Sequence, residues 1–359
     1  MDRAYLEQVR STGLLTFTPR GIHCPIADVY IDPMKGVDRA IVTHAHSDHA
    51  RGGSKHYLTH PITKQLMHSR IGKNLDIDTM VPGESTVING VRFSFHPAGH
   101  IPGSMQVRVE HKGEVWVATG DYKRQTDTLC DAFEPVKCHT FITECTFGLP
   151  IYRWKDTAEV FEEMNTWWRD NAANGVCSVI QAYSLGKAQQ IIKEVDHRIG
   201  PVLVHTSVAN MNAALAEMGI DLPACELITR DTPAERFRNA LVITPGSALQ
   251  TQWSEKMQPY VTAMASGWMR LRSWRQRSKL DRGFVLSDHA DWPALLQTIR
   301  ETGAEQVIAT HGYTKVFSEH LRSIGYDARA DLPERDGEHD DELAQVDTEG
   351  GDAASSASR

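Results

Sequence analysis

The segment His44-Ala-His46-Ser-Asp48-His49 is the part of the chain in which residue types and spacing indicate chemistry most clearly. Residues 39–43 before it are largely apolar and predict a short strand, and residues 48–52 predict the first turn of a helix. Because side chains alternate along a strand, His44 and His46 should lie on the same side of the chain. Imidazole and carboxylate ligands suit zinc, manganese or iron in an open, hydrolytic site, whereas thiolates would indicate a closed structural site.

Two further candidate ligands follow predicted strands downstream. His100 comes after the apolar residues 91–95, and Asp121 ends the segment 116–121. A carboxylate has two oxygens, so Asp121 could bridge two metal ions that together activate a water molecule near neutral pH. We expect two divalent ions, zinc or manganese, one held by His44, His46 and His100 and the other by Asp48 and His49. Histidine and aspartate ligands do not by themselves distinguish zinc from manganese.

This ordered set of residues resembles that of the metallo-β-lactamase fold. The resemblance implies an α/β sandwich, in which two β-sheets pack face to face with helices outside. Asp32, which follows Val29-Tyr-Ile, matches the first acidic position of the family and is expected to support the metal loop without binding metal. An acidic residue at a junction between a strand and a turn is the structural alternative for Asp32.

Three more motifs resemble those of the β-CASP nucleases, which carry an inserted α/β cap. Glu144 matches the acid of the first motif, His289 the histidine of the second and His311 that of the third, and we count His311 among the metal residues. Simple small-molecule hydrolases of the same fold lack these motifs. An inactive scaffold protein of the family would have lost ligands, and this chain retains all of them.

A closer resemblance, to the bacterial ligase-associated DNA exonucleases, covers about residues 5–330. It depends on residues 144–154, 266–269 and 284–292. It implies exonucleolytic cleavage of single-stranded DNA from the 5′ end, in DNA repair beside an ATP-dependent DNA ligase and a helicase. RNA is the alternative substrate, because RNA-processing members carry histidine at the third motif, as this chain does, and Artemis-like enzymes tend to carry valine.

The expected catalytic residues are Asp48, Glu144 and His289. A neighbouring carboxylate favours the protonated form of a histidine, so Glu144 should keep His289 cationic and able to donate a proton to the leaving oxygen. The alternative is that His289 is a structural histidine.

The order of the motifs predicts the division of the chain. Residues 1–150 would form the first part of the metallo-β-lactamase lobe, 151–280 the β-CASP cap and 281–330 the segment that returns to the lobe. Within the cap, helices are expected at 158–171 and 185–198 and strands at 176–181, 202–205 and 240–244, an alternation typical of a parallel α/β sheet.

Charged residues are unevenly distributed along the chain, with an acidic tail at residues 331–359 and a basic segment at residues 268–282. The whole chain carries a net charge of −8, and residues 331–359 alone account for it with ten acidic and two basic residues, so we expect a disordered tail. The basic segment could follow the phosphates of a single strand, with a tryptophan stacking on a base, or be a solvated helix or loop with its tryptophans in the core. The candidate nucleic-acid residues are Arg270, Arg272, Trp274, Arg275, Arg277 and Lys279.

No segment is apolar enough to cross a membrane or to act as a signal peptide, so we expect a cytoplasmic protein without membrane partners. The six cysteines form no Cys-x-x-Cys pair, and we expect reduced and mostly buried thiols.

Overall fold

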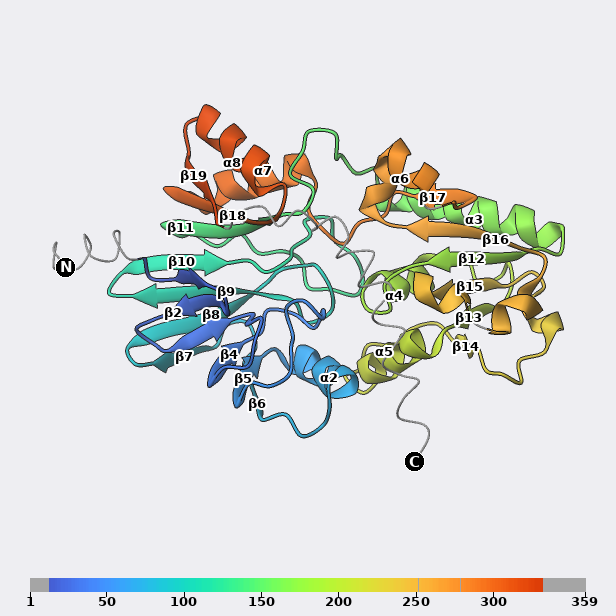
Figure 1. Ribbon diagram of the computed structural model, residues 1–359, viewed down its shortest axis with the longest axis horizontal. Helices are drawn as coiled ribbons and strands as arrows, with labels where there is room; N and C mark the ends of the chain where they lie inside the picture. The colour runs from blue at the N-terminus through green and yellow to red at the C-terminus, as the bar shows by residue number, and fades with distance from the viewer. Residues whose placement is uncertain (1–12, 251, 278, 332–359) are drawn as a thin grey trace. The chain divides into compact units, whose positions relative to one another are not determined.

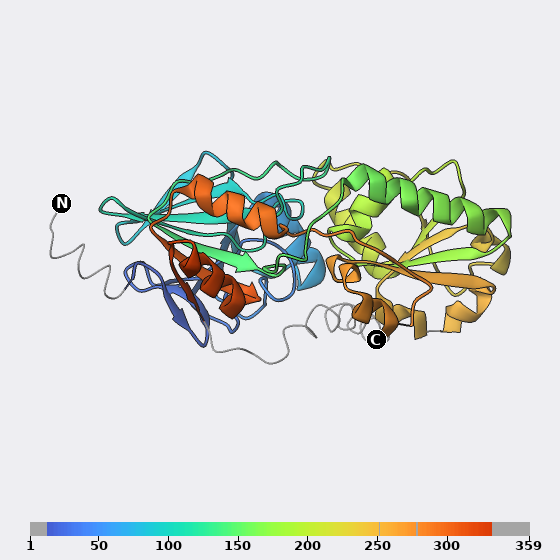
Figure 2. The same cartoon turned by 90° about the horizontal axis from the view of Figure 1, so that it is seen from above.

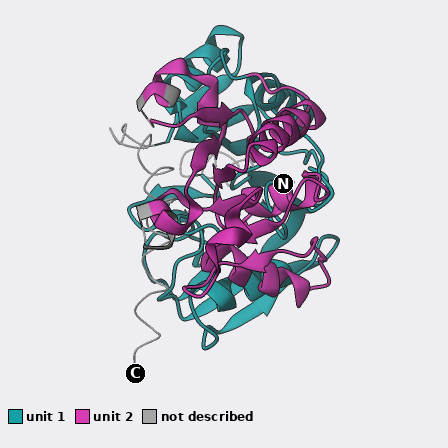
Figure 3. Ribbon diagram, turned by 90° about the vertical axis from the view of Figure 1, so that its right-hand side faces the viewer, with its two compact units in different colours: residues 1–152, 289–336 teal, residues 153–288, 337–359 magenta. Residues whose placement is uncertain are grey.

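The computed structural model describes residues 13–250, 252–277 and 279–331, so the acidic tail expected at 331–359 lies, apart from Asp331, outside the described residues. The described chain divides into two compact units, shown in different colours in Figure 3. The first unit comprises residues up to Tyr152 and from His289 onward, and the second runs from Arg153 to Asp288.

Two sheets make up the framework of the first unit. The six-stranded sheet has the order β1 (Thr16–Thr18), β2 (Gly21–Cys24), β3 (Val29–Ile31), β4 (Arg39–Ile41), β5 (His56–Thr59) and β6 (Ile77–Thr79). The seven-stranded sheet has the order β19 (Asp327–Ala330), β18 (Gln306–Gly312), β11 (Thr140–Cys145), β10 (Glu114–Ala118), β9 (Met105–His111), β8 (Val91–Pro97) and β7 (Ser85–Ile88).

Side chains alternate along the strands, so the seven-stranded sheet buries one face against the six-stranded sheet and the other face against helices. Val29 and Ile31 of the first sheet pack in one apolar cluster with Phe93 and Phe95 of the second, so the sheets lie face to face. On the other face of the seven-stranded sheet, Val117 packs with helices α7 (Trp292–Thr302) and α8 (Thr314–Ser323). Figure 1 shows these two helices over that sheet, while α2 (Pro61–Arg70) lies beside β6.

The second unit is built on a parallel sheet. Its order is β14 (Glu226–Leu227), β13 (Val202–Val204), β15 (Leu241–Thr244), β12 (Cys177–Gln181), β16 (Tyr260–Ala265) and β17 (Arg282–Phe284), and every pairing is parallel. Its helical segments, seen from above in Figure 2, are α3 (Thr157–Ala173), α4 (Lys187–Glu194), α5 (Thr206–Ala216), α6 (Arg272–Arg277), η1 (Ala234–Phe237), η2 (Gly246–Gln250), η3 (Gln252–Met257) and η4 (Gly267–Arg270).

Apolar residues cover both faces of this parallel sheet. Ile180 of β12 packs in a cluster with residues of α3, α4 and α5, whereas its neighbour Val179 packs in a second cluster with Phe237 of η1. Burial on both faces explains why the strands are continuous apolar runs. The helix expected at 185–198 is shorter, because Gly186 precedes it with φ 89° and Val195 is already extended.

One local prediction was wrong. Residues 48–52 do not begin a helix. A single turn spans residues 46–50, in which the amide of Ala50 donates to the carbonyl of His46 over 2.8 Å. The turn cannot continue because Gly53 has φ 98° and lies so close to Gly36 that a Cβ on Gly36 would sit 2.4 Å from the carbonyl oxygen of Gly53. The chain then enters β5 directly.

All six cysteines carry thiols that form no disulfide bond, and four of them, Cys24, Cys138, Cys145 and Cys177, are buried. Within the described residues, no helix is both long and apolar enough to cross a membrane.

Candidate metal centre

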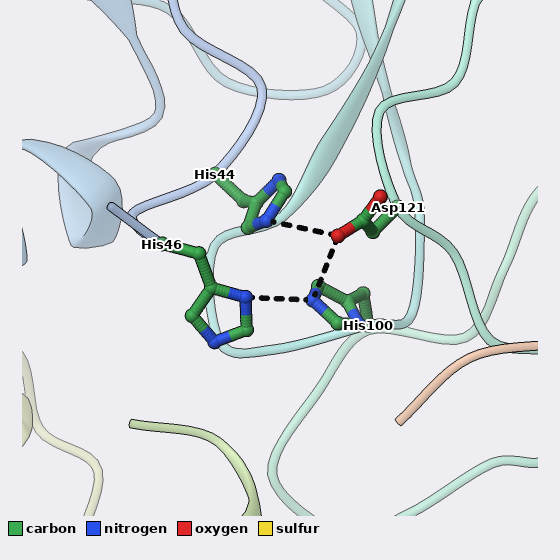
Figure 4. A group of neighbouring side chains, drawn as sticks. All are labelled: His44, His46, His100 and Asp121. Atoms are coloured by element: carbon green, nitrogen blue, oxygen red, sulfur yellow. Dashed lines mark hydrogen bonds and ion pairs between the residues drawn. The ribbon is translucent and has the colours of Figure 1, made fainter. Parts of the chain in front are cut away.

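Four buried side chains form a compact group at the end of the two stacked sheets. One ligand atom from each of His44, His46, His100 and Asp121 lies within 4.8 Å of the others (Figure 4). Nε2 of His44 and Nε2 of His100 lie 3.5 and 3.7 Å from the same Asp121 oxygen, and Nε2 of His100 lies 3.0 Å from Nδ1 of His46. Three imidazoles and one carboxylate are a suitable donor set for a divalent transition metal.

A second group shares Asp121 with the first. Asp48, His49 and Asp121 also have ligand atoms within 4.8 Å of one another. Nε2 of His49 is 3.5 Å from an oxygen of Asp48 and 3.5 Å from the same Asp121 oxygen that the first group contacts. Asp121 is therefore the only residue common to the two groups among the described residues.

Asp32 holds the loop that carries these histidines. Its carboxylate accepts hydrogen bonds from the amide of Thr43 at 2.8 Å and from the hydroxyl of Thr43 at 2.6 Å. Nδ1 of His49 lies 2.7 Å from the same carboxylate, which directs Nε2 of His49 toward the second group. Asp32 itself is absent from both ligand groups.

Gly120 allows Asp121 to approach this loop. Its φ is 57°, and a Cβ at this position would sit 2.5 Å from Oγ1 of Thr43. Only glycine fits both constraints without displacing Thr43. On the other side of the group, Ser104 accepts hydrogen bonds from the amides of His100 and Ile101 at 3.0 and 3.2 Å and so fixes the turn that presents His100.

Several buried ligand atoms of the groups make no hydrogen bond. They are Nε2 of His44, Nε2 of His49 and Oδ1 of Asp48. Since buried polar atoms nearly always have a partner, these three atoms are suited to bind a metal ion, which fits their chemistry.

The electrostatics of the groups agree with this interpretation. Burial, with the neighbouring imidazoles of His49, His100 and His46, lowers the pKa of His44 well below its usual value, so its ring nitrogen is unprotonated and able to bind metal. Burial also opposes the charge on Asp48, but His49, His46 and His311 outweigh it and lower the pKa of Asp48, which keeps the carboxylate ionised.

Glu144 and His289 form a third group with Asp121, in which one ligand atom of each residue lies within 4.8 Å of the others. An oxygen of Glu144 is 2.9 Å from Nδ1 of His289, and the ring of His289 lies 4.7 Å from that of His100. Burial raises the pKa of Glu144, but His289 and the hydrogen bonds from the amides of Thr146 and Tyr122 outweigh it, so the pKa is lowered. An ionised Glu144 fixes the orientation of His289 and leaves Nε2 as the nitrogen that can exchange a proton with a substrate.

His311 is not part of either ligand group; its ring stacks on that of His49 with centroids 5.1 Å apart. His311 is the extra residue of a β-bulge, because Thr310 pairs with Glu144 and Gly312 pairs with Cys145. Its φ is 53°, and the thiol of Cys145 donates to its carbonyl oxygen over 3.1 Å. The bulge thus sets the direction of the His311 side chain.

The basic segment belongs to the second unit. Arg270, Arg272 and Lys279 are exposed, whereas the side chains of Arg275 and Arg277 lie outside the described residues. The base-stacking role expected of Trp274 does not fit the structure, because its ring is 8% exposed and packs 5.7 Å from that of Trp268. Trp274 is a core residue.

The sequence interpretation missed several residues that shape the centre. Thr43, Gly120, Ser104 and Tyr122 each stand beside a candidate ligand or within its motif, so proximity in the sequence was the available signal. The roles of Thr43, Gly120 and Tyr122 depend on contacts with distant segments, which the sequence does not contain, whereas Ser104 acts within its own turn.

Comparisons with known proteins place this fold and site in a class. No protein-family model matches the chain. The probable DNA ligase of Opitutus terrae is 29% identical over 314 residues, which cover 86% of this chain and 30% of the ligase-named protein. An RNase J-like protein of Methanocaldococcus jannaschii is 28% identical over 46% of this chain and 45% of its own length.

A third relative is the cleavage and polyadenylation specificity factor 73 of Drosophila melanogaster, 26% identical over 48% of this chain and 26% of its own length. The matches therefore span less than half of each of these three relatives. A crystal structure of a protein of unknown function from Enterococcus faecalis shares the fold, with a TM-score of 0.56 at 14% identity over 83% of this chain and 79% of that one.

These relatives confirm the resemblance to the metallo-β-lactamase-fold β-CASP nucleases and the mixed α/β fold class inferred from the sequence. The chain is thus similar both to nucleases of that kind and to a ligase-named protein.

If Asp121 bridges two ions, Asp121→Ala should reduce bound metal below two ions per chain and abolish hydrolysis. Metal content is measured by elemental analysis after dialysis, beside an Asp78→Ala control on an exposed carboxylate of β6. Retention of two ions with near-native turnover would remove the bridging assignment.

Proposed function

We propose that the protein is a metal-dependent nuclease that hydrolyses phosphodiester bonds in single-stranded DNA from the 5′ end. The observation that carries the proposal is the pair of ligand groups that share Asp121, with the Glu144–His289 pair beside them. Small-molecule hydrolysis needs the ligand groups alone, and the pair of buried Glu144 and partly exposed His289 adds a proton donor suited to a poor leaving group.

The ligand groups fit two divalent ions, zinc or manganese. His44, His46 and His100 would hold one ion and Asp48 and His49 the other, with Asp121 between them. Bound ions of this kind supply Lewis acidity and lower the pKa of water. Asp32 contributes by orienting His49 through the 2.7 Å contact with its Nδ1.

His289 would act as the general acid. As the oxygen of the attacking water bonds to phosphorus, the bond to the 3′ oxygen breaks and that oxygen needs a proton. His289 donates it from Nε2, and Glu144 favours the protonated imidazole and holds it in place. The products are a 3′ hydroxyl and a 5′ phosphate.

DNA is favoured by the relative named as a probable DNA ligase, whose alignment covers 86% of this chain and 30% of that protein. We infer a role in DNA repair, in the cytoplasm, beside an ATP-dependent ligase and a helicase. RNA is the second candidate, since two other relatives are named for RNase J and for a cleavage and polyadenylation factor.

The proposal is tested with matched DNA and RNA strands labelled at either end, incubated with metal-free protein to which zinc or manganese is added. We expect mononucleotides from the 5′ end of single-stranded DNA and little release from RNA. Faster cleavage of RNA would favour the second candidate, and internal cuts would exclude an exonuclease.

The role of His289 predicts a dependence on the leaving group. His289→Ala should slow cleavage of DNA about 100- to 10,000-fold, the usual range for a general acid, with metal content unchanged. A diester that releases p-nitrophenolate needs no proton donor and should recover most of the loss. Equal losses on both substrates would indicate that His289 binds phosphate or metal.

The exposed arginines Arg270 and Arg272 are proposed to contact phosphates. Each contact in a single-strand complex contributes about −0.7 to the slope of log K against log salt, so replacing both with glutamine should make the slope shallower by about 1.4. A matched control replaces Arg198, whose exposed side chain already pairs with Asp196. An unchanged slope in the double variant would show that the two arginines are surface charges only.

A further inference from the structure

Lys187 is a buried charge that none of the roles above uses. Its side chain is 1% exposed, at the first position of α4, and its ammonium lies 3.4 Å from a carboxylate oxygen of Asp288, which is also buried. The same ammonium sits 4.6 Å from the centre of the Tyr183 ring. Both ends of this ion pair belong to the second unit.

The start of α4 is fixed by its own hydrogen bonds. The side chain of Gln189, fully buried, accepts from the amide of Gly186 at 2.7 Å and donates to the carbonyl of Ser184 at 2.9 Å and to Asn212 at 2.8 Å. Lys187 therefore projects from a fixed point, with its ammonium beside the carboxylate of Asp288.

The chain passes from the second unit to the first between Asp288 and His289. Leu286 is buried in the core of the second unit, and on the other side of the crossing the amide of Ala290 donates to the carbonyl of Tyr122 in the first unit over 2.7 Å. Three residues, Ser287, Asp288 and His289, thus separate these two anchored positions, and the side chain of His289 is held by Glu144.

Stability alone gives little reason for this ion pair. A buried pair can often be replaced by apolar residues with no loss of stability, because desolvation offsets the attraction between the charges. Ala188, Ile191 and Ile192 of the same helix are apolar and belong to the core, although Gln189 and Gln190 are buried beside them. An apolar pair would not replace the ion pair in one respect. Apolar packing does not hold one particular atom of each side chain at a defined distance from the other, whereas an ion pair does.

We propose that Lys187 is a positioning residue for the proton donor, which acts through Asp288 to fix the backbone next to His289. This inference rests on the proposed function, because it assigns Lys187 to the same proton transfer. A displacement of about 1 Å in a reacting group can reduce the rate about 100-fold. A loss of that size is a sufficient reason for the protein to keep the ion pair.

The test uses Lys187→Met, which keeps the apolar stem and removes the charge, and Lys187→Arg, which keeps the charge. Lys187→Met should reduce kcat on DNA about 10- to 100-fold with little change in KM, and should lose much less on a diester that releases p-nitrophenolate. Lys187→Arg should recover most of the activity. Combined with His289→Ala, Lys187→Met should cause no further loss, because both changes remove the same contribution.

A readout independent of activity is hydrogen exchange. In Lys187→Met, peptides that cover residues 285–291 should exchange faster, while peptides that cover 44–50 should not change. Ile192→Ala is the matched control, because it leaves a cavity in the same helix without touching the ion pair. It should lower the melting temperature without any dependence on the leaving group.

If Lys187→Met does not fold, Lys187→Met combined with Asp288→Asn removes both buried charges and carries the same test. Equal losses on the two substrates, or losses that add to those of His289→Ala, would overturn the positioning role. A raised KM would instead assign Lys187 to substrate binding. If His289→Ala itself shows no dependence on the leaving group, the proposed function fails, and that outcome is distinct from a failure of Lys187 alone.

Discussion

One oxygen of Asp121 is the contact on which both ligand groups depend. It lies 3.5 to 3.7 Å from three different imidazoles, and burial around it raises the pKa of the carboxyl group. A buried carboxylate is costly unless cations or hydrogen bonds surround it. The histidines and aspartates gathered here are therefore most stable with bound cations, and the two groups cannot be altered independently.

The surrounding structure keeps this arrangement compact. Asp32 holds Thr43 and His49 at once, and Gly120 leaves room for Thr43 against the turn that carries Asp121. These residues bind no metal in our proposal, yet each one fixes a ligand or the backbone beside it. Residues that orient ligands in this way tune a metal site almost as strongly as the ligands themselves.

Patterns that depend on local spacing could be predicted from the sequence. The histidine segment, the strand before it and the alternating elements of the second unit follow from periodicity and residue type, and the structure places these elements close to the expected positions. The absence of a helix at residues 48–52 could not be predicted, because the close approach of Gly36 and Gly53 comes from the tertiary fold. Likewise, the sequence shows that Trp274 stands among cations but not that its ring faces Trp268.

The insertion of the second unit between Tyr152 and His289 also determines the order in which the centre is assembled. Every residue of the two ligand groups has been synthesised by position 121, and Glu144 follows soon after, on β11. The strand that pairs with β11 is β18, so the seven-stranded sheet stays incomplete until the whole second unit has left the ribosome. Since chains fold from the N-terminus as they are made, the candidate metal ligands can gather long before the proposed general acid exists. Under the proposed function, a nascent or truncated chain would hold metal without being able to protonate a leaving group, and cleavage would begin only with the last part of the fold.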